Sequence, residues 1–211
     1  MQNELEHFMI GRSYGGNQDW MQDAWMKLGG CAALAAVDSC LYFTLFRKMK
    51  GLCPIDARKL TKDSYRSFGM IMKPYISPRW RGVDKMCYFT EGFGQYLKDR
   101  KVTGITMEEF PMGVPYAAAE EAIRRQIDAG IIIPMLHLTG KNRRVKEYNW
   151  HWFLLNGYRK TEEGFFVKAV TYSEYEWVDL TDLWHEDAPE NGGLILYSLT
   201  GAEKAEDKST G

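Results

Sequence analysis

The longest apolar segment of the chain begins at Cys31 and contains no glycine or proline until Gly51. Helices end at such residues, so the pattern predicts one long helix from Cys31 to about Met49. Its apolar residues cover most of the helix circumference, which is typical of a helix that is buried on all sides. The glycines just before it, Gly29 and Gly30, allow a tight backbone turn into its first residue. We therefore expect the protein to be built around this helix.

The rest of the chain divides into a helical first half and a strand-rich second half. Apolar residues at helical spacing predict helices, and alternating or continuous apolar runs predict strands. The helices are expected at 60–72, 90–98, 115–129 and 178–185, and the strands at 102–107, 131–138, 150–158, 164–172 and 193–199. Pro134 is expected to break its strand or to place it at a sheet edge. This order predicts an α+β protein with an antiparallel sheet.

Length and termini favour a single domain. The 211 residues are enough for a sizeable core. We expect one domain over 1–200, with a helical lobe at about 17–129, a sheet lobe at about 130–200 and a flexible tail at 201–211. Residues 1–16 are predicted to be irregular, and the basic loop 141–146 is predicted to be a solvent-exposed hairpin tip.

Charge and cysteine usage argue against several kinds of partner and cofactor site. The net charge of −1 argues against nucleic acid or an anionic membrane as a general partner. The cysteines Cys31, Cys40, Cys53 and Cys87 form no CxxC pair and have no zinc-finger spacing to histidine, so no metal site or other cofactor is expected. The sequence contains no signal-peptide pattern and no membrane span, which predicts a cytoplasmic protein with reduced thiols.

Cys31 is the leading candidate for chemistry. At the N-terminus of a buried helix, the helix dipole and the free N–H groups favour a thiolate and lower the pKa of a cysteine. A nucleophilic role is therefore one interpretation, and a small core residue packed beside alanines is the other. The segment 17–25, which is rich in amides, acids and tryptophan, either lines a cleft or forms a short capped helix.

A strand reading His-Trp-Phe-Leu-Leu-Asn-Gly-Tyr begins at His151, some 120 residues after Cys31, and ends at Gly157 and Tyr158. Together with the cysteine at the start of a buried helix, this strand resembles the papain-like cysteine peptidase superfamily. The likeness is to the bacterial branch that includes the double-glycine leader peptidases. It covers about residues 17–40 and 130–185, and it implies a papain-like α+β fold with a cleft between the lobes.

The resemblance implies roles for particular residues. Cys31 would be the nucleophile, His151 the general base and acid, and either Gln22 or Gln18 the oxyanion donor. The family places an Asn or Asp at the end of the strand after the histidine, where this chain has neither. The residues that could replace it are Thr171, Ser173 and Glu174. The glutamines lie nine and thirteen positions before the cysteine, farther than in the family, and Gly-Gly-Cys-Ala differs from the family's usual surroundings of the nucleophile.

The implied function is a cysteine-dependent amide or peptide hydrolase that acts through a thioester on a peptide or a small amide. Acyl transfer to an amine is a variant within the same class. The alternative is a catalytically inactive papain-like protein that binds peptides or acts as a scaffold, which the missing Asn or Asp favours. A redox sensor using Cys31 and Cys40 is disfavoured, because nine residues are about two and a half helical turns, which places the two thiols on opposite sides of the helix. Substrate and oligomeric state are left open by the sequence.

Overall fold

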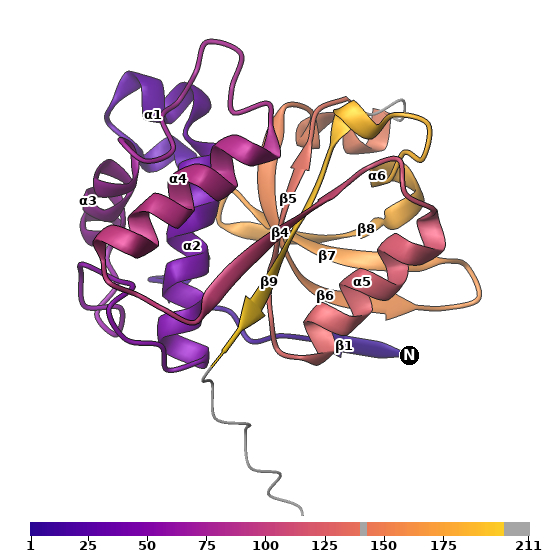
Figure 1. The fold of residues 1–211 in the computed structure, drawn as a ribbon, viewed down its shortest axis with the longest axis horizontal. Coiled ribbons are helices and arrows are strands. Elements are labelled where there is room, and N and C mark those ends of the chain that lie inside the picture. The colour runs from indigo at the N-terminus through magenta and orange to yellow at the C-terminus, as the bar shows by residue number, and fades with distance from the viewer. Residues whose placement is uncertain (140–142, 201–211) are drawn as a thin grey trace, which may run out of the picture.

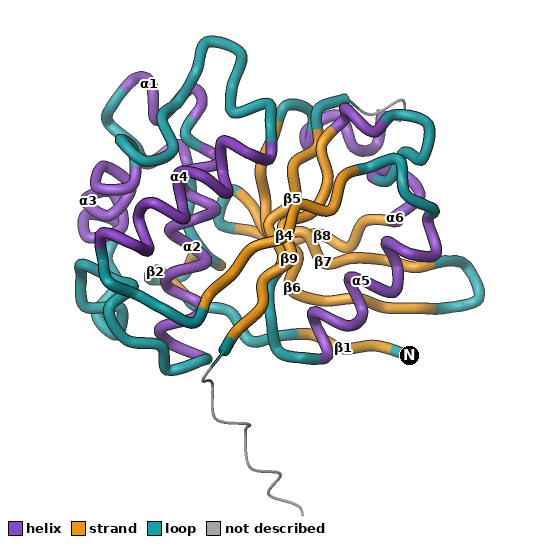
Figure 2. The backbone as a smooth tube through the Cα atoms, viewed as in Figure 1, coloured by secondary structure: helices purple, strands orange, loops and turns teal. Residues whose placement is uncertain are grey.

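The computed structural model describes residues 1–139 and 143–200. The predicted tail at 201–211 and residues 140–142 of the predicted hairpin tip lie outside the described residues. The protein combines helices with an antiparallel seven-stranded sheet, which confirms the predicted α+β class (Figures 1 and 2). The helices are α1 (Ala24–Gly29), α2 (Cys31–Phe46), α3 (Lys62–Met72), α4 (Met86–Asp99), α5 (Tyr116–Asp128) and α6 (Leu180–Leu183), with short 3-10 helices at Gln18–Trp20, Arg143–Tyr148 and Pro189–Asn191. The strands are β1 (Gln2–Glu4), β2 (Met9–Ile10), β3 (Ser13–Tyr14), β4 (Ile105–Pro111), β5 (Ile133–His137), β6 (His151–Lys160), β7 (Phe165–Thr171), β8 (Glu174–Asp179) and β9 (Gly192–Leu199).

The main sheet has the order β4-β9-β5-β6-β7-β8, and β1 pairs with the second half of β6. Helices cover both of its faces. Residues of α2 and α4 pack on one face, with α3 packed against α2, and residues of α5 and α6 pack on the other face. Figure 1 shows α1 to α4 gathered on one side of the sheet, with α5 and α6 on the other side. Because side chains alternate along a strand, burial on both faces explains why β5, β6 and β9 read as nearly continuous apolar runs.

The predicted central helix is present as α2, and every residue from Cys31 to Val37 is buried. It begins where expected and ends at Phe46, three residues earlier than predicted, because Lys48 adopts a left-handed conformation with a φ of 54°. Only Gly30 separates α1 from α2. A Cβ atom at Gly30 would lie 2.4 Å from the Met26 carbonyl oxygen, so this junction requires glycine.

Several predicted boundaries differ from the structure. The segment 1–16, which we expected to be irregular, contains β1 on the sheet and the β2–β3 pair. The predicted helix at 178–185 is only the short α6, preceded by β8. The expected helical lobe at 17–129 includes β4 and α5, which belong to the sheet and to its second face. Pro134 does not place β5 at an edge, since β5 lies between β9 and β6; the proline sits just outside the stretch that pairs with β9.

Candidate active site

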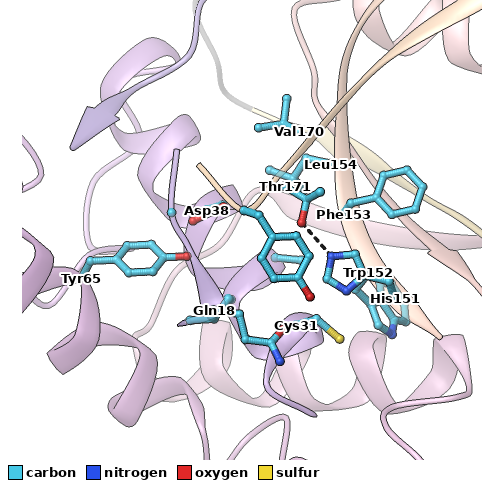
Figure 3. Close-up of a pocket in the computed structure, with 14 residues that line it drawn as sticks. Gln18, Cys31, Asp38, Tyr65, His151, Trp152, Phe153, Leu154, Val170 and Thr171 are labelled. Carbon is cyan, nitrogen blue, oxygen red and sulfur yellow. Dashed lines mark hydrogen bonds between the residues drawn. The ribbon is translucent and has the colours of Figure 1, made fainter. Parts of the chain in front are cut away.

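The first turn of α2 and the adjacent ends of β6 and β7 meet at a small pocket with a cavity volume of about 30 Å³. Cys31, Gln18, His151 and Thr171 all line this pocket (Figure 3). Cys31 is the first residue of α2, His151 the first of β6 and Thr171 the last of β7. Four of the seven candidate site residues named from the sequence are therefore brought together, although they are spread over more than 150 positions of the chain.

His151 is held from two sides. Its Nε2 shares a hydrogen bond of 2.7 Å with Thr171 Oγ1. The ring of Tyr172 stacks on the imidazole, with 5.0 Å between ring centroids and an angle of 9° between the planes. The residue before the histidine, Trp150, has a φ of 56°, a conformation that is uncommon for a bulky side chain and that sets the direction in which β6 begins. With Nε2 engaged, Nδ1 is the ring nitrogen left to exchange a proton.

The thiol of Cys31 contacts the same strand. Backbone N–H groups near its sulfur, including that of Trp152, the residue that follows His151, oppose the rise of the thiol pKa. Figure 3 shows the sulfur beside the imidazole, on the side away from Thr171. The nearby thiol also contributes to the raised pKa of Tyr172, after burial, so the phenol of Tyr172 lies close to Cys31 as well.

Burial dominates the electrostatics of both groups. Burial raises the pKa of the Cys31 thiol, and the backbone N–H groups on the sulfur offset this only in part. Burial also lowers the pKa of His151 to about 4. The expectation that the helix start lowers the thiol pKa is therefore wrong for this site, because removal from water outweighs the helix terminus. At neutral pH the thiol and the imidazole are both uncharged.

Among the three residues considered as the third group, Thr171 is the one that contacts the imidazole. Glu174 is exposed, and Ser173 Oγ has no hydrogen-bond partner among the described residues. Thr171 reaches His151 because β7 ends there and the chain turns at Tyr172 and Ser173, whose φ values are 49° and 69°. A hydroxyl in this position orients the ring but carries no charge to stabilise an imidazolium.

The two candidate oxyanion donors are in different places. Gln18 is buried and lines the pocket, whereas Gln22 is exposed and is not among the lining residues. The Gln18 amide donates one hydrogen bond to the Lys27 carbonyl at 2.8 Å, which fixes its orientation, and its second N–H bonds to none of the described residues. Only Gln18 can therefore face a group bound at Cys31.

A carboxyl group that the sequence analysis did not single out also lines the pocket. Asp38 follows Cys31 by seven residues on α2, so both lie on the same face of the helix as Leu34 and Ala35. Burial raises the pKa of Asp38 to about 7, opposed by the nearby Tyr65 hydroxyl and Gly16 N–H. The spacing of 31, 34, 35 and 38 was visible in the sequence and could have indicated it.

The remaining cysteines and histidines lie elsewhere. Cys31 and Cys40 are both free thiols, and Cys40 lies near Cys53, whose sulfur contacts the Cys40 carbonyl. His137 lies near His185 and shares a hydrogen bond with the Tyr148 carbonyl. Within residues 1–139 and 143–200, no three His, Cys, Asp or Glu side chains are grouped to hold a metal ion. The helices of this same part are all too short or too polar to cross a membrane.

Comparison with protein-family models gave no match, and no curated protein or solved structure is significantly similar to the chain.

Proposed function

We propose that the protein has a papain-like arrangement and hydrolyses an amide or peptide bond through a thioester on Cys31. The observation that carries this proposal is that the first residue of a helix and the first residue of a strand line the same pocket. Cys31 opens α2, His151 opens β6, and both line one pocket, where the backbone N–H of the residue after the histidine lies near the sulfur. Acyl transfer through cysteine requires a thiol, a proton acceptor and donors for the oxyanion, and this pocket contains all three.

The reaction would begin with neutral groups. As the sulfur attacks the carbonyl carbon, its proton moves to His151 Nδ1, and the developing oxyanion is held by the Gln18 amide and the Cys31 N–H. The imidazolium then returns the proton to the leaving amine, and the C–N bond breaks to give the thioester. In the second half, water attacks the thioester, its proton goes to His151, and the acid is released as the thiol is re-formed.

Thr171 takes the position of the third member of a triad. Its hydroxyl fixes the imidazole through Nε2 at 2.7 Å, so that Nδ1 faces the thiol. It provides orientation without the charge of an Asp, which predicts slower turnover than a triad with a carboxylate. No metal or organic cofactor is required by these steps.

The second candidate is a catalytically inactive protein that binds peptides in the same pocket. It is favoured by the burial of Cys31, of which 7% is exposed, and by the hydroxyl in place of an Asn or Asp. In that case the thiol serves only as part of the wall of the binding pocket.

A generic activated ester, p-nitrophenyl acetate, separates these two functions. For the hydrolase we expect repeated turnover, with an acetyl adduct found on Cys31 by mass spectrometry. Turnover should disappear in Cys31→Ala and fall about 100-fold or more in His151→Ala, because a positioned base contributes on that scale. Cys87→Ser is the matched control, since Cys87 is a free cysteine outside the pocket, and it should behave as the wild type.

An adduct that forms once and is not released, or no adduct at Cys31, would favour the binding protein instead. Addition of a small amine during turnover distinguishes hydrolysis from acyl transfer, because a transferase would divert the acetyl group to the amine.

A further inference from the structure

The pocket extends along α2 from the thiol toward a carboxyl group. Cys31 and Asp38 are separated by two turns of one helix, or about 10 Å along its axis. Both line the same pocket, and Figure 3 shows Asp38 and Tyr65 on the side away from Thr171 and His151. The proposed mechanism uses the Cys31 end and leaves the Asp38 end without a role.

The Asp38 carboxyl lies among polar neighbours. The hydroxyl of the buried Tyr65 and the Gly16 N–H are close to it and favour its ionised form. A Cβ atom at Gly16 would lie 1.9 Å from the Tyr65 hydroxyl oxygen, so the glycine leaves the space that this arrangement needs. Asp38 Oδ1 is shielded from solvent and has no hydrogen-bond partner in the described part of the chain. A buried polar atom without a partner costs stability, which a bound hydrogen-bond donor would recover.

The walls between the two ends are apolar. Leu34, Ala35, Leu154 and Val170 line the pocket, and no lysine or arginine is among its lining residues. Such a lining suits an unbranched hydrocarbon chain, which would have to widen the cavity of about 30 Å³ on entering it, and the carboxyl beyond it suits a donor at the end of that chain. A primary ammonium suits one free acceptor oxygen better than a guanidinium, which presents a planar fork of donors.

We propose that Asp38 determines specificity by binding a primary amine at the end of a lysine-like chain on the acyl group that Cys31 attacks. This proposal rests on the proposed function and names the substrate class of the same site. The amine would form an ion pair with the carboxylate, and the chain would lie along the apolar wall. Because burial disfavours the carboxylate of Asp38 in the empty pocket, a cation beside it stabilises the ionised form.

The test compares two thioesters that differ only in the amine, the thiobenzyl esters of Nα-acetyl-lysine and Nα-acetyl-norleucine. We expect kcat/KM to be about tenfold or more higher for the lysine ester, the scale of a hydrogen bond to a charged group. In Asp38→Asn the ratio should approach one. Asp63→Asn, which changes an exposed carboxylate on α3, is the matched control and should keep the wild-type ratio. Equal rates in the wild type, or faster reaction of the norleucine ester, would overturn the proposal.

A binding measurement keeps this proposal separate from the proposed function. The amides of Nα-acetyl-lysine and Nα-acetyl-norleucine are titrated into Cys31→Ala protein and followed by NMR. Tighter binding of the lysine amide that is lost in the Cys31→Ala, Asp38→Asn double variant supports the role of Asp38 even if no thioester is hydrolysed. Equal affinity of the two amides refutes it even if Cys31 proves to be catalytic. So does tighter binding of a ligand whose side chain has the same length and ends in a carboxamide in place of the amine.

Discussion

Replacing Thr171 by valine removes the hydroxyl that holds His151 Nε2 and keeps the shape of the side chain. The hydrogen bond is short, at 2.7 Å, and the imidazole is 6% exposed, so water cannot readily take the place of the hydroxyl. The substitution therefore tests whether orientation of the ring by Thr171 contributes to the reaction.

The size of the effect follows from the charge that the ring gains. In the resting site both partners are neutral, and such a bond contributes about 0.5–1.5 kcal/mol. When His151 takes the thiol proton the bond is made to a charged group and is worth about 1.5–3 kcal/mol. Only the difference between the two states, about 1–1.5 kcal/mol, slows the reaction. Since about 1.4 kcal/mol is a tenfold change in rate, Thr171→Val should slow acylation of Cys31 about 5- to 12-fold.

The assay is the rate of acetyl-adduct formation on Cys31 with p-nitrophenyl acetate, followed by mass spectrometry. Thr171→Ser keeps the hydroxyl and is expected to retain most of the rate. A folded Thr171→Val protein that reacts within about twofold of the wild type would refute the reasoning, because the bond would then contribute far less than such bonds usually do.

A substitution at Thr171 also predicts the direction in which the pH–rate profile shifts. His151 accepts a proton only while it is neutral, so acylation is lost as the pH falls through its pKa, which burial lowers to about 4. In Thr171→Asp a carboxylate beside Nε2 raises that pKa. The acidic limb of the pH–rate profile should therefore move to higher pH, and an unchanged limb would show that the carboxylate does not contact the ring.

Three further predictions concern stability and accessibility. Gly16→Ala should destabilise the fold by about 1–3 kcal/mol through overpacking, measured by thermal unfolding, whereas Gly94→Ala, whose Cβ has only one atom near it, at 3.9 Å, should be neutral or stabilising. Glu4→Gln should destabilise the protein more than Lys168→Met in urea unfolding, because the ammonium of Lys168 is almost fully buried and Glu4 is its ion-pair partner; equal effects would contradict this. Native protein should be alkylated by iodoacetamide at Cys31 more slowly at pH 7 than urea-unfolded protein, because burial raises the pKa of this thiol; a faster native reaction would contradict it.

The sequence predicted the parts of the site that depend on local pattern. The buried helix and its start at Cys31 follow from a long apolar run preceded by two glycines, and the strand at His151 follows from its apolar length. Both signals are contained within a few neighbouring residues, so they do not need knowledge of distant contacts.

What the sequence missed depends on contacts between distant segments. The choice of Thr171 over its neighbours required the turn at Tyr172, where the predicted strand ran one residue too far. The N-terminal strand is polar and short, and only its pairing with β6 makes it a strand. Predicting the direction of the thiol pKa shift required the degree of burial of Cys31, which a helix start alone does not reveal. Asp38 was missed because the helix was treated as buried on all sides. The neighbour of Asp38, Tyr65, comes from α3, which the sequence did not place beside this residue.

The two-residue turn between β7 and β8 has both of its residues at positive φ, which in hairpins is the usual place of Asn and Gly. Here the residues are Tyr172 and Ser173, and the tyrosine ring lies on the imidazole. Tyr172→Asn with Ser173→Gly would relax the backbone and also uncover His151. The turn residues that suit the backbone best would thus leave His151 uncovered, whereas Tyr172 shields it. Selection for thermal stability alone should therefore replace Tyr172 and Ser173 before other residues of the pocket.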